Sequence, residues 1–211
     1  MKLPFSHAEF LDAFSAYNSA LWPVAAALWL LSLAAFVQIL RGKHNNRAVT
    51  ALLAVHWGWA GVANHWAYFA AIKPAALAFA LGFLVQALFL AMFAWRGSIR
   101  YSMDRSPRHV IGAALALYSL LYPGLAAIVM GSYPRIPTFG VPCPATLFTI
   151  ALLLMTTRIR MWLLAIPWLW AMIGGSAAVL LGVIPDFALM AAALLVPLLK
   201  LAPRSFERPA R

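Results

Sequence analysis

Acidic residues are scarce in this chain, which has five Asp and Glu against sixteen Lys and Arg. Charged residues of both signs make up only 10% of it, compared with about 25% of an average soluble domain. A single cysteine excludes an intramolecular disulfide framework and a metal cluster held by cysteines alone. The sequence patterns of serine hydrolases, zinc proteases and phosphate-binding loops are also missing. We therefore expect no catalytic residues of these classes, no metal and no cofactor.

Apolar residues, in contrast, make up 64% of the chain. They gather into seven runs, most of which reach the length of roughly 20 residues that a helix needs to cross a bilayer. The runs are Leu21–Leu40, Val49–Ile72, Pro74–Trp95, Val110–Met130, Pro144–Thr157, Met161–Gly182 and Pro185–Leu199. The sequence predicts an all-α membrane protein, a single domain over residues 1–211 with seven transmembrane helices and no soluble module.

The basic residues are distributed unevenly among the segments that join these runs. Thirteen of the sixteen follow the first, third, fifth or seventh run, and only Lys2, Lys73 and Arg135 fall on the other side. Because short cytoplasmic loops carry the excess of Lys and Arg, the N-terminus is predicted outside and the C-terminus inside, with residues 203–211 as a short cytoplasmic tail. The arginine-rich loops then face the anionic head groups of the bilayer, and no nucleic-acid partner is expected.

The first 18 residues precede the first apolar run and have a pattern of their own. Ser6 and Glu9 have the spacing of a capping box, which starts a helix. Apolar residues then recur at helical spacing. This pattern predicts that residues 7–18 form an amphipathic helix on the outer, periplasmic surface of the membrane, with a turn into the first span at Trp22 and Pro23.

The fifth run is the shortest, because its fourteen residues would rise only about 21 Å as a helix. It is preceded by a proline-rich stretch, Pro134–Pro144, which cannot be regular helix. Irregular backbone is tolerated at membrane depth only where protein or a wet cavity surrounds it. We therefore expect this stretch to enter the outer half of the bundle.

Two histidines, His56 and His65, lie within the second run. On a straight α-helix they project from opposite faces, about 13.5 Å apart along the axis, so one metal ion or haem is not expected to bind both. We expect His56 to be neutral and hydrogen-bonded to a neighbouring helix. Gln86 is expected to bond between helices, and Gly174 and Gly175 to let two helices pack closely.

Polar side chains from several segments fall on the outer side of the predicted membrane. Convergent polar groups in an apolar cleft are the usual form of a small-molecule site. Loop packing and helix capping are the alternative explanation of the same pattern. The candidate site residues are Tyr17, Asn18, Asn64, His65, Thr138, Cys143 and Asp186.

Two of these candidates have alternative roles of their own. Asp186 opens the seventh run, where a carboxylate caps the helix start; a salt bridge to Lys73 or Arg135 is the alternative. Cys143 lies between two prolines and is expected to be a small buried hydrophobe. Binding of a soft metal by Cys143 and His65 is the alternative.

Three segments carry a family resemblance. They are Phe10–Asn18 followed by Trp22 and Pro23, then Pro137–Pro144 and Trp170–Ser176. Through these segments the chain resembles, over most of its length, a bacterial multi-pass membrane family catalogued as domain of unknown function 6064. The resemblance implies a multi-pass protein of the bacterial inner membrane. Some members carry a permease label, but the family has no established activity and transfers no catalytic residue.

These observations lead to one hypothesis about function and two alternatives. The hypothesis is a non-enzymatic inner-membrane protein that binds or passes a small solute, as a permease does, through an outer-facing cleft. The first alternative is a membrane sensor or assembly factor that acts through a protein partner. The second is a membrane-embedded enzyme. The sequence leaves the solute, the energy coupling and the oligomeric state open.

Overall fold

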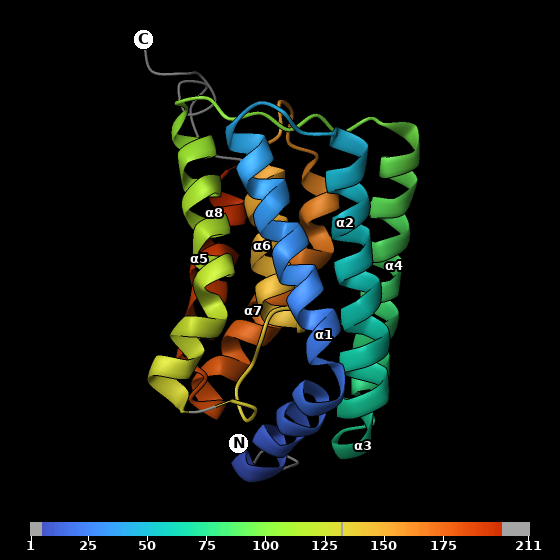
Figure 1. Ribbon diagram of the computed structural model, residues 1–211, viewed down its shortest axis with the longest axis vertical. Helices are drawn as coiled ribbons and strands as arrows, with labels where there is room; N and C mark the ends of the chain where they lie inside the picture. Colours follow the sequence, from blue (N-terminus) through green and yellow to red (C-terminus); the bar gives the residue numbers. More distant parts are fainter. Residues whose placement is uncertain (1–5, 132, 200–211) are drawn as a thin grey trace.

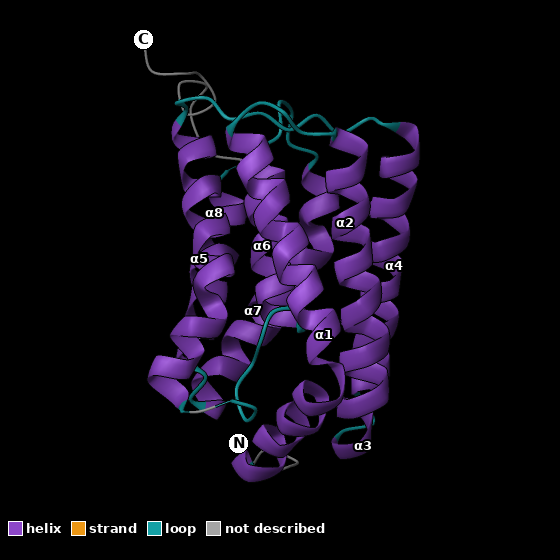
Figure 2. Ribbon diagram, in the orientation of Figure 1, coloured by secondary structure: helices purple, strands orange, loops and turns teal. Residues whose placement is uncertain are grey.

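The computed structural model describes residues 6–131 and 133–199, which form an all-helical bundle (Figure 1). Figure 2 shows the helices running along one long axis, with loops at the two ends. No strand occurs within the described ranges, only an isolated antiparallel bridge between Tyr101 and Thr156. The predicted all-helical fold is therefore confirmed. The predicted tail, residues 203–211, lies outside the described residues.

Four helices in the described part of the chain are long and apolar enough to cross a membrane. They are α1 (His7–Leu40), α4 (Ala76–Arg96), α5 (Pro107–Met130) and the stretch Met161–Leu181, which joins the 3₁₀ turn η2 (Met161–Leu164) to α7 (Ala165–Leu181). Two further apolar helices are shorter. They are α6 (Pro142–Leu154) and α8 (Phe187–Leu198), the latter preceded by the 3₁₀ turn η3 (Ile184–Asp186).

α1 is one continuous helix of 34 residues, which corrects the prediction of a separate surface helix over residues 7–18. Its start is as predicted, because Ser6 is the N-cap and forms the capping box with Glu9. Pro23 lies inside the helix instead of at a turn between two helices. A proline removes one N–H donor and kinks a helix without necessarily ending it. Figure 1 shows the lower, dark-blue part of α1 turned away from the direction of its upper part.

The second predicted run is helical without interruption from Asn46 to Ile72, but its hydrogen bonding changes along the way. α2 (Asn46–Trp59) is a regular α-helix. It leads into ten residues of π-helix, η1 (Ala60–Phe69), and then into the short α3 (Ala70–Ile72). A π-helix has i→i+5 bonds, is rare, and is frequently found at functional sites. The straight α-helix assumed for the two histidines was therefore wrong.

The short helix α6 lies at the centre of the bundle. Twelve of its thirteen residues are buried, and Figure 1 places it behind α1, between α5 and α2. α5 approaches it closely at Gly112, where a Cβ atom would lie only 2.8 Å from the carbonyl oxygen of Ala151. A helix that protein surrounds on all sides does not have to match the thickness of the hydrocarbon. Enclosure thus accounts for the short fifth run.

The proline-rich stretch between α5 and α6 is held against α1. Asn18 donates from Nδ2 to the carbonyl oxygens of Pro134 and Ile136, at 2.7 Å in both cases. Tyr133 donates its hydroxyl to the carbonyl oxygen of Asn18 at 2.9 Å. Because side chains of the protein satisfy these groups, the irregular backbone can lie inside the bundle, as predicted.

The other end of α6 is bonded by a buried arginine. Arg108 of α5 donates from Nη1 to the carbonyl oxygens of Leu154 at 2.7 Å and Thr156 at 2.6 Å. Only 4% of Arg108 is exposed. These two carbonyls follow the last helical bonds of α6 and have no helical partner of their own. The arginine therefore acts as the C-terminal cap of the central helix.

Other predicted contacts between helices are confirmed. Gln86 of α4 donates from Nε2 to the carbonyl oxygen of Leu163 at 3.1 Å. A Cβ atom at Gly174 would lie 2.9 Å from a side-chain carbon of Leu189, so α7 and α8 approach closely at this glycine. Gly175 packs in the same way against Met190.

The connecting loops fall at opposite ends of the bundle (Figure 1). The loops before α2 and α5 lie at the upper end, and the segment after α6 joins them there through the bridge between Tyr101 and Thr156. We call this the arginine-rich end, because the basic residues in ranges 41–47, 96–108 and 158–160 belong to it. The N-terminal part of α1 and α3 lie at the opposite end.

Arg108→Ala should destabilise the protein by about 3 kcal/mol, because it removes two charge-assisted hydrogen bonds and leaves the carbonyl of Leu154 without a donor, while Nε2 of His109 stays 3.3 Å from the carbonyl of Thr156. Thermal unfolding of the purified protein in detergent micelles measures the change. Arg105→Ala is the matched control, because it removes the same charge from an exposed residue of the same segment; its effect should stay below about 0.5 kcal/mol. Equal destabilisation by both variants would show that Arg108 is not a helix cap.

Candidate functional site

A cavity of about 170 Å³ lies inside the bundle, lined by residues of α1, η1, α4, α6 and α7 together with the segment before α8. Most of its wall is apolar, and the rings of Phe10, Phe14 and Phe69 pack edge to face beside it. We call it the inner cavity. A cavity of about 150 Å³ can hold a benzene ring, so the inner cavity suits a solute of similar size.

The π-helical turns of η1 carry Asn64 and His65 to the inner cavity, and both residues are buried. The imidazole ring of His65 is surrounded by aromatic rings. Its centroid lies 5.8 Å from that of Phe79, 4.7 Å from that of Phe83 and 4.9 Å from that of Trp170. The histidine is thus fixed by packing against α4 and α7 rather than by hydrogen bonds.

Two polar atoms in the cavity lining have no hydrogen-bond partner among the described residues. They are Nδ2 of Asn64 and Nε2 of His65, whereas the indole of Trp170 lies beside the thiol of Cys143. Asn64 and His65 are only 2% and 4% exposed, so bulk solvent does not satisfy them. Burying a polar group without a partner costs about 1–3 kcal/mol, and folded proteins seldom accept this cost without a reason. A molecule bound in the cavity would supply the missing partners.

Asp186 and Cys143 also line the inner cavity. Tyr122 of α5 donates its hydroxyl to Oδ1 of Asp186, and the thiol of Cys143 lies beside the same carboxylate. The predicted helix cap is wrong, because Asp186 makes no side-chain bond to the start of α8. Its carboxylate is buried in the bundle, where a tyrosine hydroxyl is the available donor. The alternative ion pair with Arg135 is also wrong, since Arg135 pairs with Asp12 at 2.9 Å.

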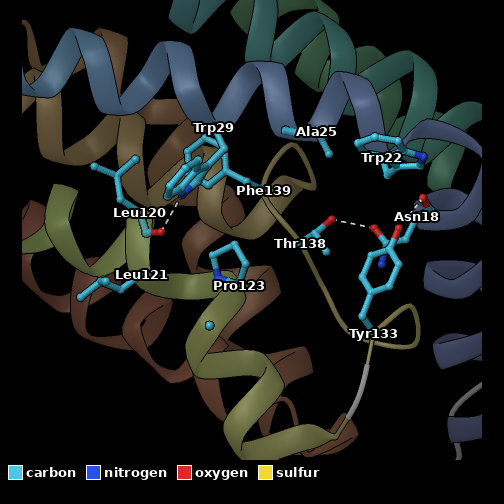
Figure 3. Close-up of a pocket in the computed structure, with 12 residues that line it drawn as sticks. Asn18, Trp22, Ala25, Trp29, Leu120, Leu121, Pro123, Tyr133, Thr138 and Phe139 are labelled. Atoms are coloured by element: carbon cyan, nitrogen blue, oxygen red, sulfur yellow. Dashed lines mark hydrogen bonds between the residues drawn. The ribbon is translucent and has the colours of Figure 1, made fainter.

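A larger, open groove of about 640 Å³ lies between α1 and α5 (Figure 3). Pro123 interrupts the regular bonding of α5 here, and Trp29 of α1 donates from Nε1 to the carbonyl oxygen of Leu120 at 2.8 Å. Figure 3 shows Thr138 and Phe139 of the proline-rich stretch between the two helices. We call this space the lateral groove.

The seven candidate residues do not share one cleft. Tyr17 lines neither space, because it is fully buried and its hydroxyl accepts a hydrogen bond from Nε1 of Trp59 at 2.6 Å. Asn18 and Thr138 line the lateral groove, but Oγ1 of Thr138 donates to Oδ1 of Asn18 at 2.6 Å. The four candidates that line the inner cavity are Asn64, His65, Cys143 and Asp186.

The proline-rich stretch forms the wall between the two spaces. Thr138 and Phe139 line the lateral groove, whereas Val141 lines the inner cavity. Gly140 lies between them with a φ of 95°, a conformation that favours glycine. A Cβ atom at Gly140 would lie 3.2 Å from the hydroxyl oxygen of Tyr17. Tyr17 therefore supports the wall rather than the site.

His56 lies away from the inner cavity and is a structural histidine, as predicted. Its Nε2 is 2.8 Å from Oγ of Ser32 on α1, and its ring packs against Phe139. His65 faces α4 and α7 instead. The two histidines therefore have different neighbours, although the helix between them is not regular.

Sequence reasoning missed Trp170 and Tyr122 as members of the site. Trp170 lies inside an apolar run, where an aromatic residue indicates only core or lipid contact. Tyr122 directly precedes Pro123, and a hydroxyl beside a helix kink is a signal that could have been used. The partner of Tyr122 lies 64 positions further along the chain, so only the fold shows what it bonds.

The inner cavity has the composition of a small-molecule site. The described residues contain no group of three or more His, Cys, Asp or Glu placed to hold a metal ion. The thiol of Cys143 lies beside the carboxylate of Asp186, and no described contact joins Cys143 to His65. Unpaired polar groups in an apolar enclosure are instead the usual form of a small-molecule site.

Comparison with known proteins gives one match. A sequence model of DUF6064, a family of unknown function, matches residues 7–209. The match includes every helix that lines the inner cavity and the lateral groove, and it confirms the resemblance predicted from the sequence. No curated protein and no solved structure matches the chain.

His65→Phe should leave the stability of the ligand-free protein unchanged or raise it, because it replaces an unpaired polar ring with an apolar one in an aromatic setting. His56→Phe is the comparison. It should cost about 1 kcal/mol, because it leaves the buried Ser32 hydroxyl without its imidazole partner. Thermal unfolding of both variants in the same detergent tests this. A loss for His65→Phe as large as that for His56→Phe would give His65 a structural role.

Proposed function

The chain belongs to DUF6064, a family of unknown function, and we propose that it is a seven-span protein of a bacterial inner membrane that binds and passes a small solute. The inner cavity is the proposed binding site. The observation that carries the proposal is that two buried polar atoms without partners, Nδ2 of Asn64 and Nε2 of His65, line this one apolar cavity. A core that served stability alone would pair such atoms or replace them with apolar groups.

Seven spans follow from four helices that are long and apolar enough by themselves and three segments that depend on their neighbours. The helical stretch from Asn46 to Ile72 exceeds the roughly 20 residues that a span needs. α6 is enclosed by protein, and α8 packs closely on α7. Because the cytoplasmic side carries the excess of Lys and Arg, the arginine-rich end faces the cytoplasm and the N-terminus lies outside.

The cavity lining indicates what kind of solute fits. Asn64 and Trp170 offer N–H donors, and Nε2 of His65 donates or accepts according to its tautomer. Lys73 also lines the cavity and adds a positive charge. The phenylalanine rings suit a short hydrocarbon chain. A short-chain carboxylate or amide, with acceptor oxygens at one end and an apolar body, matches this lining.

The lateral groove supplies the open part of the proposed outer cleft. The proline-rich stretch contributes to the lining of both spaces, with Gly140 at the point where the lining changes from one space to the other. Passage of a solute between the two spaces requires this wall to move. A glycine with positive φ and no side chain is a position where such a movement meets little steric resistance.

Modification of Cys143 reports whether the cavity is occupied, because Cys143 is the chain's single thiol and lines the cavity. In the purified protein, a small membrane-permeant thiol reagent should label it slowly, and a bulky impermeant reagent should not. Butanoate or butanamide should slow the labelling in a saturable way. In His65→Phe the concentration needed for protection should rise about tenfold, as for the loss of one hydrogen bond.

The control for this experiment is His56→Phe, which changes a histidine outside the cavity and should keep normal protection. Mass spectrometry of the intact protein quantifies the labelled fraction over time. Rapid labelling by the bulky reagent, or labelling that neither probe slows, would remove the support for an enclosed solute site.

Topology is tested separately with reporter fusions. Fusions after Asn45, Met103 and Arg211 should be active only as cytoplasmic reporters, and fusions after Lys73 and Arg135 only as periplasmic ones. This result is expected because the positively charged connections are retained inside. A cytoplasmic N-terminus or an even number of spans would refute the proposed orientation.

A further inference from the structure

A third pocket, of about 250 Å³, lies at the arginine-rich end. Its lining residues are Ser98, Ile99, Arg100, Thr157, Arg158 and Arg160. Half of these residues are arginines and none is acidic. We call it the arginine pocket. None of its lining residues lines the inner cavity, and it takes no part in the proposed solute site.

Backbone pairing fixes the shape of the arginine pocket. Its two segments run antiparallel, and the amide of Thr157 donates to the carbonyl oxygen of Arg100 at 2.9 Å. One step further, the amide of Ser102 donates to the carbonyl oxygen of Met155 at 2.8 Å. The hydrogen bonds between the two segments therefore fix the backbone positions of Arg100 and Arg158 relative to each other.

The third arginine is held in place by its neighbours. Arg160 donates from Nη2 to the carbonyl oxygen of Ser98 at 3.3 Å, and its Cζ atom lies 5.1 Å from the centroid of the Phe93 ring. Oγ of Ser98 is buried and has no hydrogen-bond partner among the described residues. The pocket thus combines guanidinium donors with an unpaired hydroxyl, a set that a ligand with several oxygen atoms would satisfy.

The described acidic residue at this end does not neutralise the pocket. Asp104 lies 2.8 Å from Nδ1 of His109. Burial acts to raise the pKa of Asp104, but hydrogen bonds from Ser106 and the charges of His109 and Arg108 outweigh it and hold the pKa below its usual value. The carboxylate is therefore ionised and already engaged, and the positive charge of the three pocket arginines remains available to a ligand.

We propose that the arginine pocket binds the phosphate group of an anionic membrane lipid. Guanidinium groups match phosphate oxygens because they donate two parallel hydrogen bonds. Trp95 and Trp162, both exposed, belong to the same end, and tryptophan is enriched at the level of lipid head groups. A lipid rather than a free phosphate is the occupant, because its acyl chains would lie along the apolar surface of the neighbouring helices.

Isothermal titration of the full chain in a neutral detergent tests the proposal with three probes: short-chain phosphatidylglycerol, short-chain phosphatidylcholine and inorganic phosphate. The anionic lipid should bind most tightly. Combined replacement of the pocket arginines, R100Q, R158Q and R160Q, should weaken its binding at least about tenfold, since each arginine near a charged lipid surface contributes measurably. The single variant R158Q, which leaves the bonded Arg160 in place, should show part of this loss with unchanged thermal stability.

The matched control is the combined variant R41Q, K43Q and R105Q, which removes the same charge from exposed residues of the same end. It should change the affinity less than about twofold if the pocket is specific, with only general screening of surface charge. Equal losses in the pocket and control variants would overturn the proposal in favour of a diffuse surface attraction. Tighter binding of inorganic phosphate than of the lipid would also overturn it, by making the ligand a soluble anion.

Discussion

A carbonyl group at membrane depth has to be hydrogen-bonded within the protein, and this requirement shapes the centre of the bundle. α6 is short, so irregular backbone lies at both of its ends. Asn18 donates to that backbone from α1, and Arg108 donates to it from α5. The enclosed central helix, the proline-rich stretch before it and the two spaces on either side of that stretch all depend on these donors.

The two spaces differ in how their polar atoms are satisfied. In the lateral groove Thr138 bonds to Asn18, and Asn18 bonds to the backbone. In the inner cavity Nδ2 of Asn64 and Nε2 of His65 have no partner among the described residues. These same two residues lie in a π-helix, a rare conformation that is frequently found at functional sites. Local conflicts of this kind are expected where a fold gives up stability for binding.

The sequence predicts the helices well because the signals for them are local: apolar runs, prolines, and the cap at Ser6. It fails where the partner is remote in the chain. Arg108 is counted among loop charges in the sequence, yet it is buried and bonds to carbonyls more than forty positions away. Asp186 has the sequence context of a helix cap, yet its donor is Tyr122. The π-helix at residues 60–69 carries no local marker in the sequence. The division of the predicted cleft into two spaces depends on contacts between remote segments, and only the fold shows it.

The continuity of α1 has a mechanical consequence. Phe10 and Phe14 of this helix line the inner cavity, Trp22 and Trp29 line the lateral groove, and Pro23 lies among them. The part of the helix before Pro23 therefore contributes aromatic residues to both spaces. A change in the angle of this part at the proline would alter the volume of the cavity and that of the groove together, so the two spaces are mechanically coupled through one helix.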